Sequence, residues 1–150
     1  MATGQLIPPP PDGWCPPRPQ SIEDTGLTHA FIEDLLMKIM YTRGKLNGHE
    51  IAQLAHLPFA TITSAVLDYL KGELMCEIKG SRGIGASSYQ YILTTKGAAR
   101  ARDLLERNAY AGAAPVSWDD YTNAIEEQGT EQLRVNPNDM RECLAHLVME

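Results

Sequence analysis

The chain has 150 residues, 43% of them hydrophobic and 21% charged, and a formal net charge of −6. This length and composition are typical of one globular domain with appendages. No apolar run reaches the ~18 residues of a membrane span and no secretory leader is recognisable, so we expect a cytoplasmic protein with no membrane partner. Its three cysteines, Cys15, Cys76 and Cys143, are odd in number and far apart, which argues against a disulfide framework.

The charge is unevenly distributed along the chain. Residues 21–110 carry ten basic and ten acidic side chains, whereas residues 111–150 carry two basic and eight acidic ones and so account for the whole net charge. DNA binding draws much of its affinity from Lys and Arg side chains that neutralise phosphates. A neutral central part therefore predicts that any DNA binding is weak.

Residues 1–20 contain seven of the ten prolines, including the run from Pro8 to Pro11. Proline lacks the backbone donor and favours the polyproline II conformation, so this segment is predicted to be a disordered leader. The alternative is that the run binds an aromatic groove of a partner.

Two helices are predicted after the leader. The first covers about 28–43, where apolar residues recur at three- and four-residue spacing. The second is short and begins near Asn47, whose amide can form a capping box with Glu50. Leu57-Pro58 ends it, and Pro58 suits the first position of a further helix.

The third predicted helix, about 58–71, has the recognition position of a helix–turn–helix. We expect four residues to point inward: Ile62, Val66, Tyr69 and Leu70. The outer face is predicted to hold Thr61, Thr63, Ser64 and Asp68, with Lys71 as the only base. A typical major-groove reader adds Arg, Lys, Asn or Gln, and apart from Lys71 none is present in 58–72.

A hairpin follows. Residues 74–79 and 89–95 alternate as strands do, and a glycine- and serine-rich tip, 80–88, lies between them. One face is predicted to be shared by Leu74, Cys76 and Ile78 on the first strand and Tyr89, Tyr91 and Leu93 on the second. A helix over 96–108 comes next, in which Gly97 is expected to allow close packing against the sheet. This order of elements predicts a winged helix.

The tip superficially resembles a phosphate-binding loop. A P-loop requires a Lys after its last glycine and a helix behind it, whereas here Gly85 is followed by Ala86 and then by a strand. The tip of a wing is therefore the better interpretation. Arg82, helped by Lys79, is the candidate for contact with a DNA minor groove or an acidic partner.

The C-terminal part is predicted to be a linker over 109–116 and two helices. The first covers 118–128, and the second starts at Asn136-Pro137 and carries an apolar stripe formed by Met140, Cys143, Leu144, Leu147 and Val148. This stripe continues to Glu150 without a capping residue. We expect it to pack on a partner or on a following domain, with Met140, Leu144, Leu147 and Val148 as the candidate interface.

No constellation suggests catalysis. The histidines His29, His49, His56 and His146 have no zinc-ligand spacing with any cysteine, and no nucleophile is paired with a base. Cys76 and Cys143 fit small buried hydrophobic residues. We therefore expect no catalytic residue, no metal and no cofactor.

The run from Tyr89 to Gly97 resembles the "Y-x-L-T-x-x-G" close of the wing in many winged-helix domains. The segment from Ile22 to Leu27, together with the segment from Glu106 to Val116, looks like the flanks of the N-terminal winged-helix region of certain bacterial AAA-type ATPases. The resemblance covers about residues 21–149. It implies an accessory domain whose ATP-binding module would follow residue 150, and ATP as a cofactor only through that module, because these residues contain no Walker motif.

These observations lead to one preferred expectation and one alternative. The fold class is α+β, a winged helix-turn-helix with a C-terminal helical extension: leader 1–20, winged helix 21–108, linker and extension 109–150. The preferred function is a non-catalytic protein–protein recognition module of an AAA-type ATPase, with homo-oligomers left open. In the alternative, a DNA-binding regulator, Thr61, Thr63, Ser64 and Lys71 face the groove and Arg82 enters the minor groove.

Overall fold

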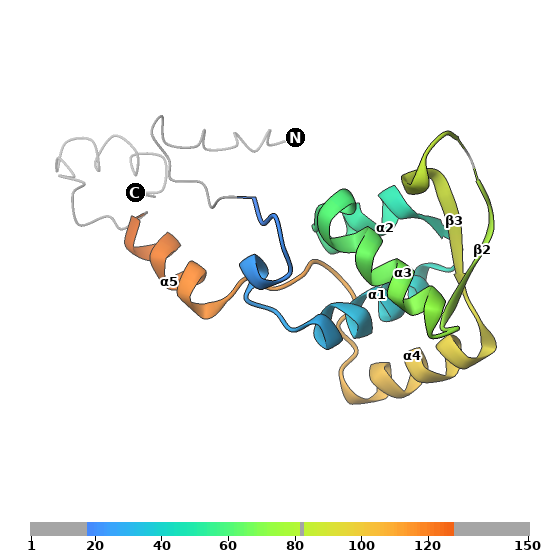
Figure 1. Ribbon diagram of the computed structural model, residues 1–150. Helices are drawn as coiled ribbons and strands as arrows, with labels where there is room; N and C mark the ends of the chain where they lie inside the picture. The colour runs from blue at the N-terminus through green and yellow to red at the C-terminus, as the bar shows by residue number, and fades with distance from the viewer. Residues whose placement is uncertain (1–17, 82, 128–150) are drawn as a thin grey trace, which may run out of the picture. The chain divides into compact units, whose positions relative to one another are not determined.

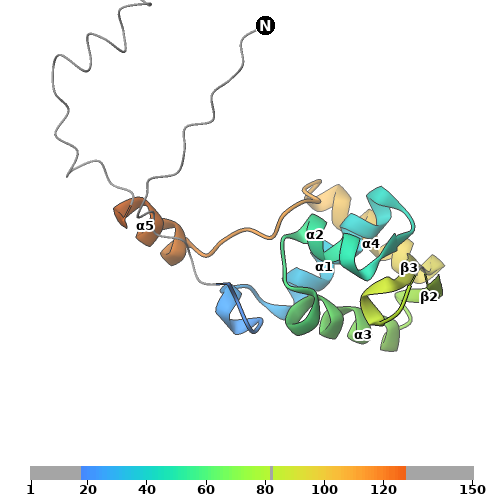
Figure 2. The same ribbon diagram turned by 90° about the horizontal axis from the view of Figure 1, so that it is seen from above.

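The computed structural model describes residues 18–81 and 83–127 (Figures 1 and 2). It divides into two compact units, one of residues 17–118 and another whose described part is 119–127. The larger unit is an α+β winged helix, as predicted. The leader up to residue 17, Arg82, and the final helix with its stripe lie outside the described residues.

Helix α1, His29–Arg43, is the centre of the winged helix. Thr28 caps its start by accepting a hydrogen bond from the Phe31 backbone N–H, and Gly44 ends it. Seven of its fifteen residues are buried, because α2, α3, α4 and β3 all pack against it. Lys38 is one of the buried residues and is only 6% exposed. Its Nζ donates to the Asn108 carbonyl at 3.4 Å.

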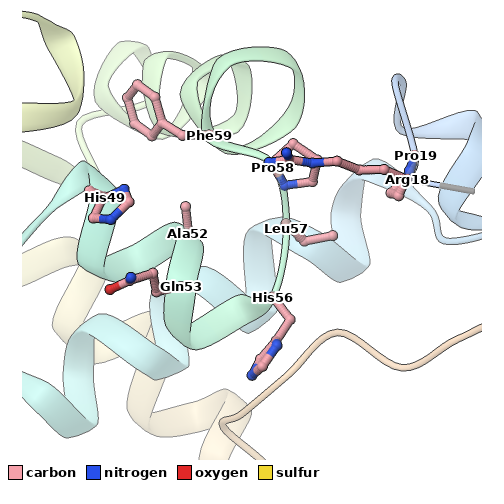
Figure 3. A pocket seen from close by; sticks show the side chains of 9 residues that line it. All are labelled: Arg18, Pro19, His49, Ala52, Gln53, His56, Leu57, Pro58 and Phe59. Atoms are coloured by element: carbon pink, nitrogen blue, oxygen red, sulfur yellow. The ribbon is translucent and has the colours of Figure 1, made fainter. Parts of the chain in front are cut away.

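Helix α2, Gly48–Ala55, begins with the predicted capping box. Asn47 Oδ1 accepts from the Glu50 N–H at 2.9 Å, and Glu50 Oε2 accepts from the Asn47 N–H at 2.7 Å. His56 ends the helix in the left-handed conformation, with φ +54°. Leu57 lies in the turn that leads to the next helix (Figure 3), and its side chain is buried.

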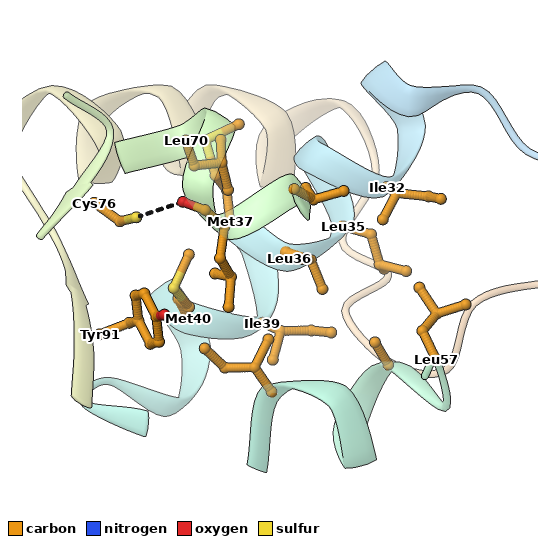
Figure 4. Close-up of a cluster of buried hydrophobic side chains, with 14 of the residues drawn as sticks. Ile32, Leu35, Leu36, Met37, Ile39, Met40, Leu57, Leu70, Cys76 and Tyr91 are labelled. Carbon is orange, nitrogen blue, oxygen red and sulfur yellow. Dashed lines mark hydrogen bonds between the residues drawn. The ribbon is translucent and has the colours of Figure 1, made fainter. Parts of the chain in front are cut away.

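The third helix is continuous over 59–72 but begins as a π-helical turn, Phe59–Thr63, before becoming α3, Ser64–Gly72. Its inward residues meet α1 in the core (Figure 4). Ile62, Val66 and Leu70 are at most 1% exposed, as predicted, and Leu67 is fully buried beside them. Tyr69 was wrongly placed inward: it is 48% exposed, and its ring contacts that of His29 edge-on.

The sheet has three antiparallel strands in the order β1-β3-β2: β1, Leu46–Asn47; β2, Cys76–Ser81; and β3, Tyr89–Leu93. The two predicted strands pair Cys76 with Leu93 and Ile78 with Tyr91. An irregularity between Ile78 and Gly80 shifts the register towards the tip. Leu74 does not share their face, because it precedes β2, has φ +58° and is 69% exposed.

Helix α4, Thr95–Arg107, starts at Thr94, whose hydroxyl accepts from the Gly97 N–H at 3.1 Å. A Cβ added at Gly97 would lie 2.0 Å from the Met75 carbonyl oxygen. The prediction that Gly97 permits close packing next to the sheet is therefore confirmed. Figure 1 shows α4 running beneath the β2–β3 hairpin and α1.

Helix α5, Trp118–Glu127, agrees with the prediction over 118–128. Trp118, Tyr121 and Ile125 are 77%, 49% and 52% exposed. Among residues 18–81 and 83–127, none of the helices combines the length and the apolar character that crossing a membrane requires.

Candidate nucleic-acid interface

The outer face of the helix over 59–72 is the first part of the candidate interface. Most of its exposed side chains are short or form an internal ion pair: Ala60, Thr61, Ala65, Asp68 and Lys71. Tyr69 is also exposed, and its ring contacts that of His29. Ser64 is half-buried, and its hydroxyl donates to the Ala60 carbonyl at 3.0 Å. Within the described residues, the Thr61 hydroxyl has no partner.

Thr63 does not belong to this face, contrary to the prediction. It is fully buried, because it precedes Val66, Leu67 and Leu70 by three, four and seven residues and so lies on their stripe. Its hydroxyl donates to the Pro58 carbonyl at 3.2 Å, which satisfies its hydrogen-bonding requirement inside the core. Thr63 therefore supports the turn before the helix and cannot contact a ligand.

Both lysines predicted at the interface are exposed but paired. Lys71 Nζ lies 2.7 Å from Asp68 Oδ1, and this hydrogen bond raises the pKa of Lys71. Lys79 Nζ lies 3.0 Å from Glu77 Oε1 on the same strand. Surface ion pairs of this kind contribute only about 0–1 kcal/mol to stability, so a DNA phosphate could replace the carboxylate as the partner of either lysine. Each lysine is balanced by one carboxylate, so the two pairs together have no net charge.

The wing is the second part. Residues 83–88 precede β3 and end in a short 3-10 turn, Ala86–Ser88, and β2 pairs with β3, so the tip is that of a hairpin and not of a phosphate loop. Gly85 has φ +95°, a value that favours glycine. Ile84 at the tip is fully exposed. Arg82, the strongest candidate for contact from the sequence, lies outside the described residues.

The start of α2 joins these two parts. A Cβ added at Gly48 would lie 2.5 Å from Phe59 Cε2 and 3.2 Å from the Ser87 carbonyl oxygen. The first residue of α2 therefore lies against both the start of the helix over 59–72 and the end of the wing. No sequence pattern distinguishes Gly48 or Phe59, because their proximity depends on tertiary packing.

An open hollow of about 490 Å³ lies beside this joint (Figure 3). Its lining includes His49 and Gln53 from α2 and His56 from the C-terminal cap of that helix. Phe59, the first residue of the helix over 59–72, and the guanidinium group of Arg18 also line it. Its lining contains no carboxylate. His49 and Gln53 were not among the residues predicted for the interface, although their spacing of four residues on a predicted helix puts them on one face.

The buried titratable groups next to this surface are structural. Burial raises the pKa of the Cys76 thiol to about 11 and also raises the pKa of Tyr91. Cys76 Sγ lies 3.8 Å from the Leu67 carbonyl oxygen and is 2% exposed, which confirms the prediction of a small buried residue. In the described part of the chain, no group of three or more His, Cys, Asp or Glu side chains could hold a metal ion.

Comparison with known proteins finds similarity among solved structures. No protein-family model matches the sequence. No curated protein gives a significant match either. Among solved structures, the chain is similar to a MarR family regulator from Neisseria meningitidis, with 17% identity over 84% of this chain and 75% of that one, and a TM-score of 0.45. It is also similar to the Staphylococcus aureus MarR bound to salicylate and kanamycin, with 11% identity, coverage of 84% and 72%, and a TM-score of 0.46. A mutant MarR from Escherichia coli in complex with operator DNA gives 14% identity, coverage of 79% and 74%, and a TM-score of 0.43.

These findings correct the expected function. The winged-helix part of the resemblance drawn from the sequence is confirmed by the order of the helices and by the three-stranded sheet. The expectation of an ATPase accessory domain is wrong, because the structures that resemble the chain are MarR regulators and not parts of an ATPase. An ATPase module as a covalent partner has no support in these comparisons.

Proposed function

We propose that this chain is a winged-helix DNA-binding regulator that inserts the outer face of the helix over 59–72 into the major groove. The observation that carries the proposal is that this helix buries its inner face in the core and leaves its outer face exposed. Ile62, Val66 and Leu70 are at most 1% exposed, whereas Thr61 and Ala65 on the opposite side are exposed. A helix–turn–helix docks on DNA with such an exposed second helix in the major groove.

The neighbouring elements have suitable positions for contacts to the DNA backbone. In a helix–turn–helix, the first helix crosses the backbone while the second enters the groove. His49 and Gln53 on α2 line a hollow that is free of carboxylates beside the start of the recognition helix. We assign phosphate contacts to these two side chains, and a minor-groove or backbone contact to the wing with Lys79.

The charges of the interface make the expected affinity modest. Lys71 and Lys79 each have a carboxylate within 3.0 Å, so binding must replace one ion pair by another. Few counterions are then released, and the affinity should depend only weakly on salt concentration. The proposal therefore relies on shape and groove contacts more than on charge.

The test is a binding titration with variants that add negative charge to the assigned face. Fluorescence anisotropy would follow a labelled duplex of mixed sequence at low salt. A variant with both Thr61→Glu and Ala65→Glu should bind at least about tenfold more weakly, because two carboxylates would face the phosphates. Both positions are exposed, so the fold should be retained, which circular dichroism would verify.

The matched control is Ala99→Glu, at an exposed position on α4. It adds a carboxylate to a helix away from the recognition helix and should leave the affinity almost unchanged. Equal weakening by the two variants would show a nonspecific charge effect and refute the assigned face. A chain that does not bind the duplex at all would refute the function.

A further inference from the structure

We infer that the recognition helix reads the C5-methyl groups of pyrimidines, thymine above all, and makes no paired hydrogen bonds to purines. This inference rests on the proposed function and deepens it, because it names the chemical group on DNA that the same face recognises. It follows from which atoms the outer face offers and which of its polar atoms are already bonded.

The exposed side chains of this face exclude the commonest specific contacts. Arg or Lys binds guanine, and Asn or Gln binds adenine, through two hydrogen bonds each. Between residues 59 and 70 the helix has no Arg, Lys, Asn or Gln. The first such residue is Lys71, in the last turn and 2.7 Å from Asp68.

Most remaining polar groups on the helix are bonded within the protein. The buried Thr63 hydroxyl donates a hydrogen bond to the Pro58 carbonyl, and the Ser64 hydroxyl donates one to the Ala60 carbonyl. Asp68 could accept a hydrogen bond from a cytosine amine, but its carboxylate already accepts one from Lys71 Nζ. What the first two turns present outward is therefore mainly methyl carbon: Cβ of Ala60, Cγ2 of Thr61 and Cβ of Ala65.

Short side chains also allow a close approach of the helix to the base edges. Apolar contact from Ala, or from the methyl group of Thr, is the readout that suits the thymine methyl in the major groove. Burying one methyl group is equivalent to about a fourfold change in affinity. Contacts by two residues would thus give on the order of tenfold discrimination for the methyl groups.

The experiment uses four alternating duplexes of equal length, so that no operator sequence has to be known. They contain dA with dT, dA with deoxyuridine, dG with dC, and dG with 5-methyl-dC. Within each pair the minor groove presents the same hydrogen-bonding groups, and only the major-groove methyl differs. We expect the methylated member of each pair to bind at least about fourfold more tightly.

Two conservative variants assign the effect to the helix. Thr61→Ser removes the methyl group and keeps the hydroxyl, and Ala65→Ser replaces the bare methyl by a hydroxymethyl group. Each should reduce the ratio of affinities for the dT and deoxyuridine duplexes. Thr95→Ser, at an exposed position in the first turn of α4, should leave the ratio unchanged.

The outcomes separate this inference from the function on which it rests. Equal affinity for methylated and unmethylated duplexes would refute methyl readout while leaving DNA binding in place. A methyl preference that survives both variants would refute its assignment to this face. No binding to any of the four duplexes would refute the inference and the proposed function together.

Discussion

Replacing Gly97 by alanine should destabilise the fold, although alanine is the better helix former. In a helix interior the exchange alone would stabilise by at most about 1 kcal/mol. Here the new Cβ would lie 2.0 Å from the Met75 carbonyl oxygen and 2.9 Å from the carbonyl carbon. Both are backbone atoms, so no side-chain rotation can relieve the contact.

The size of the loss follows from what the Met75 carbonyl does. It accepts the Thr94 N–H at 3.0 Å and the Thr94 hydroxyl at 3.2 Å, so its displacement weakens the contact that joins β2 to the start of α4. Such hydrogen bonds contribute about 1 kcal/mol each, and overpacking a core costs about 1–3 kcal/mol. After the gain in helix propensity, we expect a net loss of roughly 2–4 kcal/mol.

Urea denaturation followed by circular dichroism would measure this loss. The matched control is Gly72→Ala at the end of α3, where an added Cβ would meet no atom within 4 Å. That variant should be as stable as the parent or up to about 1 kcal/mol more stable. If Gly97→Ala also matched the parent in stability, the close approach of α4 to residue 75 would be wrong.

Three further predictions follow from burial and from the hollow beside α2. Leu70→Ala should lower the unfolding free energy by about 2–5 kcal/mol, because Leu70 is 1% exposed in the core; a loss below about half a kcal/mol in urea melts would contradict its placement. The folded-state pKa of Cys76, about 11, lies above its ordinary value of 9.0, so the folded state holds the thiol proton more tightly than the unfolded state does. The protonated thiol therefore makes its full contribution to stability below about pH 9, and this contribution is lost as the pH rises to 11. Over this window the parent should lose up to roughly 3 kcal/mol more than Cys76→Ala, and parallel pH profiles in chemical denaturation would refute this. His49→Ala and Gln53→Ala should weaken binding to all duplexes by similar factors, as phosphate contacts do, whereas a change in sequence preference would argue against that role.

The order of elements could be predicted because each boundary has a local chemical signal. The Asn47–Glu50 capping box, the glycine-rich tip and the cap at Thr94 all depend on residues close together in the sequence. Gly97 was also predictable, since a glycine near the start of a helix needs a packing reason. The winged helix therefore follows from patterns that require no knowledge of tertiary contacts.

The interface could be predicted only in part. Thr63 was predicted on the outer face, although helical spacing puts it on the buried stripe of Val66 and Leu70. That wrong prediction came from the assignment of faces and not from missing information. By contrast, strand β1 has two residues and no pattern of its own, and it forms only because β3 is available to pair with it. The salt bridges of Lys71 and Lys79 depend on rotamers, and the approach of Gly48 to Phe59 depends on how two helices pack.

Amide chemical-shift mapping by NMR tests the central claim most directly. Adding a duplex to the labelled chain should shift the amide signals of residues 59–68 and of the first turns of α2. Signals of α4, Thr95–Arg107, should remain in place. Shifts confined to α4 or α5, or no shifts at a saturating duplex concentration, would contradict the claim that the outer face of the recognition helix binds DNA.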